Sequence, residues 1–114
     1  MKKYQIGELE ELVLLSVGTL YKSAYALNIL EVIKENTQRI LDVTTIHSVL
    51  RRLEKKGYVI SSMGGATPER GGRRKRFFTL SQAGRQIIDE IMETRTYLYN
   101  QLPKLTYSRI GYEK

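Results

Sequence analysis

Hydrophobic residues recur at helical spacing near the start of the chain. A helix over residues 6–20 is predicted to have one hydrophobic face, made of Leu9, Leu12, Val13, Val17 and Leu20. Leu14 and Leu15 fall elsewhere on the helical wheel, so this helix is apolar over most of its circumference. Such a helix is normally covered on more than one side. In so short a chain, we expect the second cover to come from another subunit.

A second helical pattern covers residues 24–36, and Ser23 is its predicted N-cap. One face of this helix is made of Tyr25, Ile29, Val32 and Ile33. The helix is expected to end at Asn36 and Thr37. The next apolar segment, Arg39-Ile40-Leu41, predicts a very short strand.

The third helix has the clearest boundaries. It is predicted from Val43 to about Lys56, with Asp42 as the N-cap and Gly57 as the C-terminal stop. Its buried stripe is predicted to consist of Ile46, Val49, Leu50 and Leu53.

Two strands and a long helix complete the pattern. The strands are predicted over residues 58–63 and 76–80, and the Gly- and Arg-rich loop between them is too long for a tight hairpin. Ser81 is the predicted N-cap of a helix over about residues 82–102. The apolar positions of this helix are Ile87, Ile88, Ile91, Met92, Leu98 and Leu102.

The order of these elements predicts a mainly α (α+β) fold, a winged helix-turn-helix with a two-stranded β wing and a long C-terminal dimerisation helix. Residues 1–80 are expected to form the DNA-binding domain, and residues 81–114 the dimerisation helix and tail of the same structural unit. The sequence contains neither an internal repeat nor a linker. We therefore expect one compact unit with one projecting helix.

Positive charge is concentrated in the middle of the chain. The 114 residues carry a net charge of +7, and the segment from Arg39 to Arg76 alone holds ten Lys/Arg and three acids. The remaining residues carry nine bases and nine acids, which balance. A basic segment in a neutral frame is typical of a surface that binds a polyanion.

The third helix presents much of this charge opposite its buried stripe. Short hydroxyl residues come first along its outward face, and cations follow one and two turns later, an order that suits entry into a DNA major groove. The predicted DNA-contacting residues of this helix are Thr44, Thr45, His47, Ser48, Arg51, Arg52 and Lys55. The alternative is an ordinary solvated helix face, which usually carries mixed charges.

The loop between the strands is the second predicted DNA contact. Its cations are Arg70, Arg73, Arg74 and Lys75, and its glycines allow close approach of the backbone to a duplex. The alternatives are a solubilising loop, or an RNA-binding segment, since Arg70-Gly71-Gly72-Arg73 resembles RNA-binding Arg-Gly sequences.

Catalysis and metal binding are not expected. His47 is the only histidine and lacks partners at ligand spacing, so we assign it to a base or phosphate contact. The acidic clusters at residues 8–11 and 89–93 are interpreted as solvated helix faces. The sequence contains no phosphate-binding glycine loop and no nucleophile motif. No cofactor and no metal are predicted, and the protein is not expected to be an enzyme.

Composition also suggests where the protein acts. The chain has no cysteine, which is compatible with a reducing cytoplasm. Met1-Lys2-Lys3 is soon followed by glutamates, and the longest apolar run nearby is only Leu12 to Leu15, too short for a signal peptide or a membrane span. We expect a cytoplasmic protein without a membrane partner.

The sequence resembles the PadR family of bacterial transcriptional regulators over about residues 5–90. Gly7-Glu8-Leu9-Glu10-Glu11-Leu12-Val13-Leu14-Leu15 is similar to the family's opening helix. Ile46, Leu50 and residues 52–59 are similar to its recognition helix and following strand. Residues 69–84 resemble its wing and the start of its last helix. The single C-terminal helix resembles the short PadR subfamily.

The resemblance implies a dimeric repressor, bound to double-stranded DNA and sometimes relieved by small aromatic or cationic compounds. Thr44 and His47 stand where the family usually has Gly and Tyr, so the family's operator sequence is not carried over. We expect a homodimer on a palindromic operator. The alternative is a basic winged-helix module that binds RNA or a protein without regulating promoters.

Two further groups of residues follow from the dimer hypothesis. The predicted dimerisation residues are Leu14, Leu15, Ile87, Ile91, Leu98 and Leu102. Tyr97 and Tyr99 lie near the middle of this predicted contact, where a planar effector could bind between the first and last helices. Ordinary dimer packing is the alternative for the two tyrosines.

Overall fold

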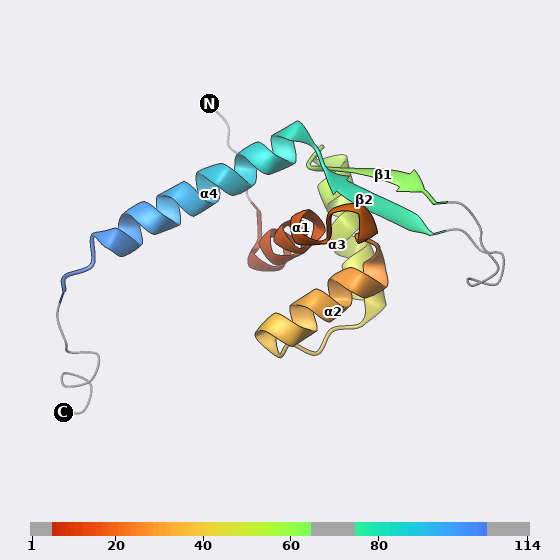
Figure 1. Cartoon of the computed structure of the whole chain (residues 1–114), viewed down its shortest axis with the longest axis horizontal. Coiled ribbons are helices and arrows are strands. Elements are labelled where there is room, and N and C mark those ends of the chain that lie inside the picture. Colours follow the sequence, from red (N-terminus) through yellow and green to blue (C-terminus); the bar gives the residue numbers. More distant parts are fainter. Residues whose placement is uncertain (1–5, 65–74, 105–114) are drawn as a thin grey trace.

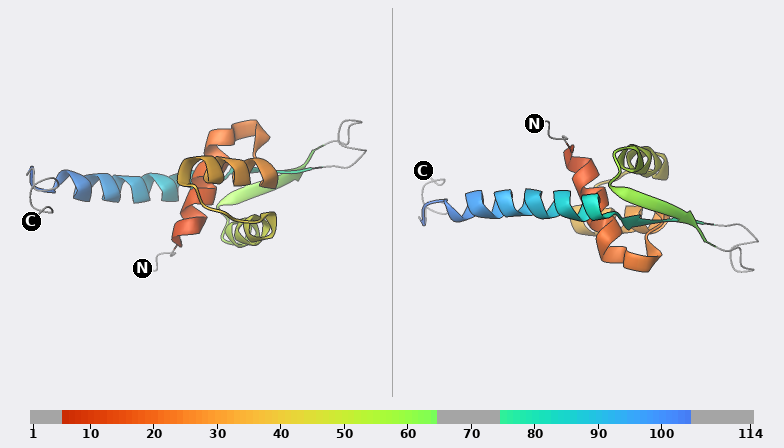
Figure 2. Two further views of the ribbon diagram at one scale, coloured as in Figure 1. Left: turned by 90° about the horizontal axis from the view of Figure 1, so that it is seen from below. Right: turned by 90° about the horizontal axis from the view of Figure 1, so that it is seen from above.

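The computed structural model describes residues 6–64 and 75–104. The elements in chain order are α1 (Glu8–Leu20), the short 3₁₀ helix η1 (Tyr21–Ser23), α2 (Ala26–Thr37), α3 (Val43–Lys55), β1 (Val59–Met63), β2 (Arg76–Leu80) and α4 (Gln82–Asn100). Three helices form a body, from which the β1–β2 hairpin and α4 extend in opposite directions (Figures 1 and 2). The chain therefore has the predicted winged-helix architecture with one projecting helix.

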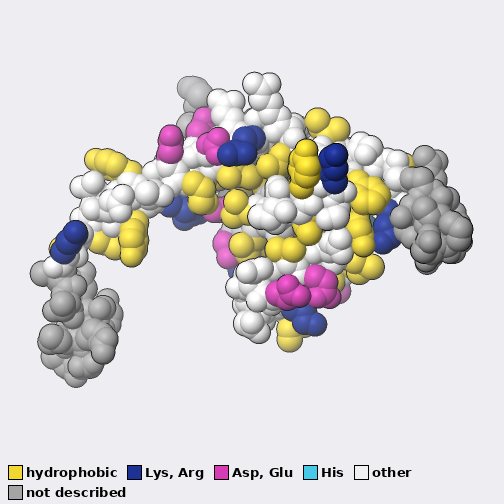
Figure 3. Space-filling model, in the orientation of Figure 1, with side chains coloured by type: hydrophobic (Ala, Val, Ile, Leu, Met, Phe, Trp, Pro, Cys, Tyr) yellow, Lys and Arg dark blue, Asp and Glu magenta, His cyan; other side chains and the backbone are white. Residues whose placement is uncertain are grey.

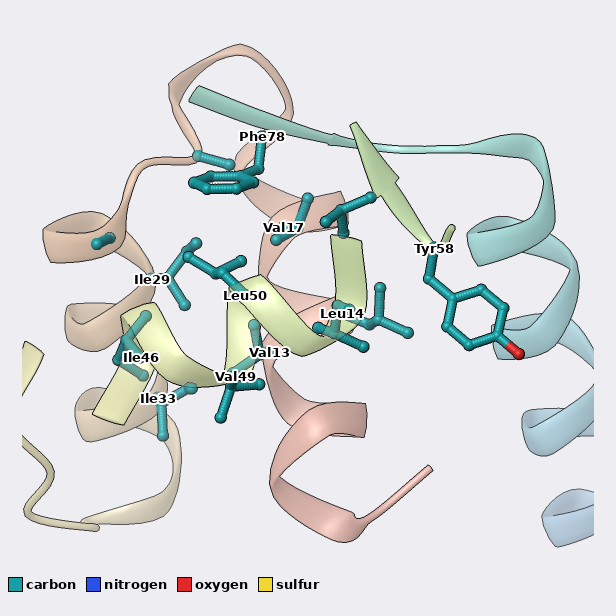
Figure 4. Close-up of a cluster of buried hydrophobic side chains, with 14 of the residues drawn as sticks. Val13, Leu14, Val17, Ile29, Ile33, Ile46, Val49, Leu50, Tyr58 and Phe78 are labelled. Atoms are coloured by element: carbon teal, nitrogen blue, oxygen red, sulfur yellow. The ribbon is translucent and has the colours of Figure 1, made fainter. Parts of the chain in front are cut away.

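Helix α1 lies at the centre of this body. It contacts α2, α3, β2 and α4 of the same chain. Leu14 has no exposed surface, and Val13 and Val17 are equally buried among side chains of α2 and α3 (Figure 4). The apolar circumference of α1 is thus covered largely within its own chain. The assignment of Leu14 to a dimer contact was wrong, because this side chain fills the core.

Helix α3 has the boundaries that the sequence predicts. The Asp42 side chain accepts a hydrogen bond from the Thr45 N–H at 2.9 Å, which satisfies one of the free donors at the helix start. Gly57 follows the helix with a φ of +84°, a left-handed conformation that favours glycine. All four residues of the predicted stripe are buried: Ile46, Val49, Leu50 and Leu53.

Two local predictions before α3 were wrong. Ser23 belongs to η1, where its hydroxyl donates to the Leu20 carbonyl, and the N-cap of α2 is Tyr25. Residues 39–41 form no strand, and Ile40 is 92% exposed. The Arg39 side chain pairs with Glu8 of α1, so this connection is fixed by a side-chain contact and not by sheet pairing.

The hairpin is antiparallel, with Val59 opposite Leu80 and Met63 opposite Arg76. The β2 strand is attached to the helical body through its main chain, because the Phe78 N–H donates to the Ala24 carbonyl at 2.8 Å. The Phe78 side chain is buried in the same core. These contacts fix the base of the wing against the junction of η1 and α2.

Helix α4 begins beside the body and then leaves it. The Ser81 hydroxyl accepts from the Gly84 N–H at 3.0 Å, which confirms the predicted N-cap. Ile88 is buried, whereas every described residue from Glu93 to Lys104 is exposed. The radius of gyration is 17.7 Å, compared with about 13 Å for a compact domain of this length. The hairpin and the outer half of α4, which extend in opposite directions, both contribute to this elongation.

Candidate nucleic-acid interface

The outer face of α3 is defined here as Thr44, His47, Ser48, Arg51 and Lys55. It lies opposite the buried stripe, and all of its residues are exposed except Ser48, which is half-buried. The short residues occupy the first two turns, and the two cations follow. This order lets the start of the helix approach a groove closely while the longer side chains reach base edges or phosphates.

The two cations of the outer face are electrostatically available. Neither Arg51 nor Lys55 forms an ion pair with any residue in the described ranges. Glu54, the acid on the same helix, accepts a hydrogen bond from Ser61 of β1 at 2.8 Å. Its carboxylate is therefore held toward the hairpin and not toward the cations.

Thr45, one of the predicted DNA-contacting residues, has a structural role at the start of α3. Its hydroxyl, like its main-chain N–H, donates to the Asp42 carboxylate, at 3.0 Å. These two hydrogen bonds lower the pKa of Asp42 below its ordinary value. Thr45 thus stabilises the start of α3, and its side chain is only partly exposed.

Arg52 lies beside the outer face but is not free. Its Nε lies 3.3 Å from a Glu10 carboxylate oxygen of α1, and the Lys56 Nζ lies 3.1 Å from the same oxygen. Glu10 is buried, with 6% of its surface exposed. The sequence interpretation missed this carboxylate, because the partners are more than forty positions away in the chain.

The other glutamates of the first turn of α1 are also paired. Glu8 contacts Arg39, and Glu11 accepts from Arg95 of α4 at 2.9 Å. The interpretation of this acidic cluster as a solvated face was therefore wrong for Glu10 and Glu11, whose side chains are 8% and 12% exposed, whereas Glu8 is solvent-exposed as predicted. Each of the three carboxylates connects α1 to a different part of the chain.

Lys75 marks the described end of the wing. Its Nζ lies 3.6 Å from the centroid of the Tyr25 ring, and that ring meets Phe77 edge-on at 5.4 Å. Lys75 is half-buried, and its contact with Tyr25 joins this end of the wing to the start of α2. The other predicted wing cations, Arg70, Arg73 and Arg74, lie outside the described residues.

The predicted dimerisation residues divide into two groups. Leu15, Ile87 and Ile91 are half-buried, and the first two pack against the core of their own chain. Leu98 and Leu102 are 59% and 56% exposed. Figure 3 shows hydrophobic side chains along both sides of the outer part of α4.

Among the described residues, Tyr97 and Tyr99 line different surface hollows. Tyr97 lines a shallow surface with Asp89 and Met92, whereas Tyr99 lines another with Leu98 and Leu102. A different hollow of about 590 Å³ lies between α1, β2 and the start of α4. Its lining includes Leu15, Gly18, Tyr21, Leu80, Arg85 and Ile88.

Within residues 6–64 and 75–104, no three His, Cys, Asp or Glu side chains are grouped closely enough to hold a metal ion. In the same ranges, no helix has the length and hydrophobicity that crossing a membrane requires.

Solved structures share this arrangement of helices and wing. A PadR-like transcription factor from Bacteroides fragilis matches with a TM-score of 0.68 and 22% identity, over 81% of this chain and 84% of that one. The chain has a PadR-like winged-helix fold. A PadR family regulator from Clostridium difficile matches with a TM-score of 0.68 and 18% identity, over 82% of this chain and 93% of the other.

A Streptococcus transcriptional regulator also matches, with a TM-score of 0.65 and 23% identity, over 82% of this chain and 86% of that one. No family model matches the sequence. No curated protein matches it either. At these identities the likeness establishes the PadR-like fold of the chain.

Proposed function

We propose that the protein is a homodimeric transcriptional repressor that binds a palindromic operator in the cytoplasm. The observation that carries this proposal is the outer face of α3. It combines exposed short side chains at the helix start with Arg51 and Lys55, which have no acidic partner among the described residues. A helix in the same place reads the major groove in helix-turn-helix proteins. The names of the solved structures with this fold, which are transcriptional regulators, agree with it.

The homodimer is supported by the outer half of α4. Leu98, in the last turns of α4, and Leu102, just after the helix ends, are both exposed apolar side chains that do not pack against the body of the chain. A second copy related by a two-fold axis offers the same surface in return. Such a dimer would place two α3 helices about 34 Å apart, one turn of DNA, on a palindromic site.

An effector is proposed at the hollow between α1, β2 and α4. Its apolar lining includes Leu15, Leu80 and Ile88, and Tyr21 adds an aromatic ring on which a planar compound could stack. The Asp89 carboxylate at its edge is paired with Arg85 at 3.1 Å. This hollow lies between the first and last helices, where an effector was predicted, but its lining does not include Tyr97 or Tyr99. Thermal-shift measurements with planar aromatic and cationic compounds test it, since a bound compound raises the melting temperature. The proposed effector site would be contradicted if no compound raises the melting temperature, or if a compound stabilises a Leu80→Glu variant as much as the wild type.

Selection of duplexes from a random-sequence pool tests the proposed function. We expect an inverted repeat whose half-sites are separated by about one helical turn. Recovery of duplexes without any shared sequence would contradict operator recognition. Preferential binding of single-stranded or double-stranded RNA in a parallel selection would instead support the alternative, a basic winged-helix module that binds RNA. If neither nucleic acid is bound, the protein-binding alternative remains.

A further inference from the structure

A buried carboxylate lies at the back of the proposed recognition helix. The Glu10 side chain, 8% exposed, accepts from the Gly7 N–H at 2.8 Å and from the Lys56 Nζ at 3.1 and 3.2 Å. The Arg52 Nε completes the set at 3.3 Å. Burial alone raises the pKa of Glu10. The hydrogen bonds and positive charge of these donors lower it by more, so the pKa lies below the ordinary value. The carboxylate is charged at neutral pH.

Arg52 uses only one part of its guanidinium in this contact. Its Nε faces Glu10, the side chain is 56% exposed, and its terminal nitrogens make no hydrogen bond within the described residues. A guanidinium has five N–H donors in one rigid plane, so four remain on the terminal nitrogens. Arg52 also follows Ser48 by one helical turn, which places it at the border of the outer face of α3.

We propose that Glu10 is a positioning residue for DNA recognition, which holds Arg52 by its Nε so that the terminal nitrogens meet a backbone phosphate. This inference rests on the proposed function. Phosphate contacts fix the register of a protein on a duplex, and base contacts then read the sequence. Glu10 therefore influences which sequence α3 reads without touching DNA itself.

Removal of the Glu10 carboxylate should change two quantities in opposite directions: the affinity for random DNA and the discrimination between operator and random DNA. Glu10 partly neutralises Arg52 and Lys56, so its loss leaves more positive charge for any duplex. Affinity for random DNA should therefore rise, with a steeper dependence on salt. Operator discrimination should fall, because the guanidinium is no longer held in one orientation.

The test compares Glu10→Gln with Glu11→Gln in the full chain. Both substitutions remove one negative charge from the first turn of α1, but Glu11 pairs with Arg95 of α4 and not with α3. We expect Glu10→Gln to lower the ratio of operator to random-duplex affinity by about tenfold. Glu11→Gln should keep that ratio. Equal ratios in the two variants would overturn the inference and leave the proposed function standing.

A second variant separates positioning from folding. Arg52→Lys keeps the charge, but the three donors of an ammonium share one nitrogen and lack the rigid plane of a guanidinium, so contact with Glu10 no longer fixes the direction of the donors toward a phosphate. Arg52→Lys should lower the ratio of operator to random-duplex affinity as Glu10→Gln does. The double variant, Glu10→Gln with Arg52→Lys, should lower this ratio no more than either single variant. Additive losses would contradict the proposal even if Glu10→Gln folds poorly. A wild-type protein that selects no duplex sequence at all would overturn both the proposed function and this inference.

Discussion

Gly84 lies directly against the main-chain carbonyl of Tyr58. A Cβ at this position would overlap the Tyr58 carbonyl oxygen and lie 3.0 Å from its carbonyl carbon. The same carbonyl accepts a hydrogen bond from the Ser81 N–H at 3.0 Å. The first turn of α4 thus packs on the residue that leads into β1, and this contact sets the direction in which α4 leaves the body.

Gly84→Ala should destabilise the fold, because the added methyl meets backbone that cannot rotate away. Forced packing of this kind typically costs about 1–3 kcal/mol. Urea unfolding measures the change. Gly18→Ala is the control, since its Cβ would meet only the end of the Leu80 side chain at 3.1 Å. Its unfolding midpoint should shift much less, and a Gly84→Ala protein as stable as the Gly18→Ala variant would contradict this account of the joint.

Two substitutions at Asp42 should separate the contribution of its capping hydrogen bonds to stability from that of its negative charge. Asp42→Ala removes the acceptor for the Thr45 N–H and hydroxyl and should lower the unfolding midpoint. Asp42→Asn keeps an acceptor oxygen and should lose less, since Asn is also a favoured N-cap residue. Thermal unfolding of both variants at neutral pH checks this order. Equal losses would mean that the charge matters and the cap geometry does not.

Acid should weaken the link between α1 and α3. The pKa of Glu10 is lowered in the folded protein, so its contribution is full above the ordinary value near 4.5 and is lost as pH falls through the folded value. Urea unfolding between pH 7 and pH 3 should show a steeper fall for the wild type than for Glu10→Gln. Parallel curves would indicate that Glu10 pairs equally well in the unfolded chain.

The dimer proposal is tested by two leucines of similar exposure. Leu98 on α4 is 59% exposed, and Leu27 on α2 is 56% exposed. Leu98→Asp should convert a dimer to a monomer in sedimentation at low micromolar concentration, because it places a charge in the proposed contact. Leu27→Asp should leave the assembly unchanged. A wild-type monomer under these conditions would refute the dimer.

Local signals in the sequence predicted most of the fold. Asp42, Gly57 and Ser81 mark helix ends by chemistry that acts within a few residues, and all three boundaries are confirmed. The stripe of α3 follows from periodicity alone. Ser23 misled the prediction because its hydroxyl bonds back to Leu20, and not forward into α2. The strand predicted over residues 39–41 rested on apolar residues, but Ile40 is exposed. An apolar pattern does not reveal whether a neighbouring strand is available for pairing.

The candidate site could be predicted only in part, for a physical reason. The exposed cations of α3 follow from the helical wheel. The partners of Glu10 and Lys75 depend on how α1, α3 and the wing pack in three dimensions, and no local pattern encodes that packing. Leu14 is a further example. The sequence shows that α1 is apolar on most sides, but not whether the residues that pack against it belong to the same chain or to another subunit.

The most direct test of DNA recognition through α3 is duplex affinity measured at several salt concentrations. The variants are Arg51→Ala, on the outer face of α3, and Lys34→Ala, which removes the same charge from an exposed position on α2. We expect Arg51→Ala to weaken operator binding by about 1–3 kcal/mol if Arg51 contacts a base, or to reduce the salt slope by about one if it contacts a phosphate. Lys34→Ala should retain both the affinity and the slope. Indistinguishable binding by the two variants would contradict the assignment of α3 as the DNA-reading helix.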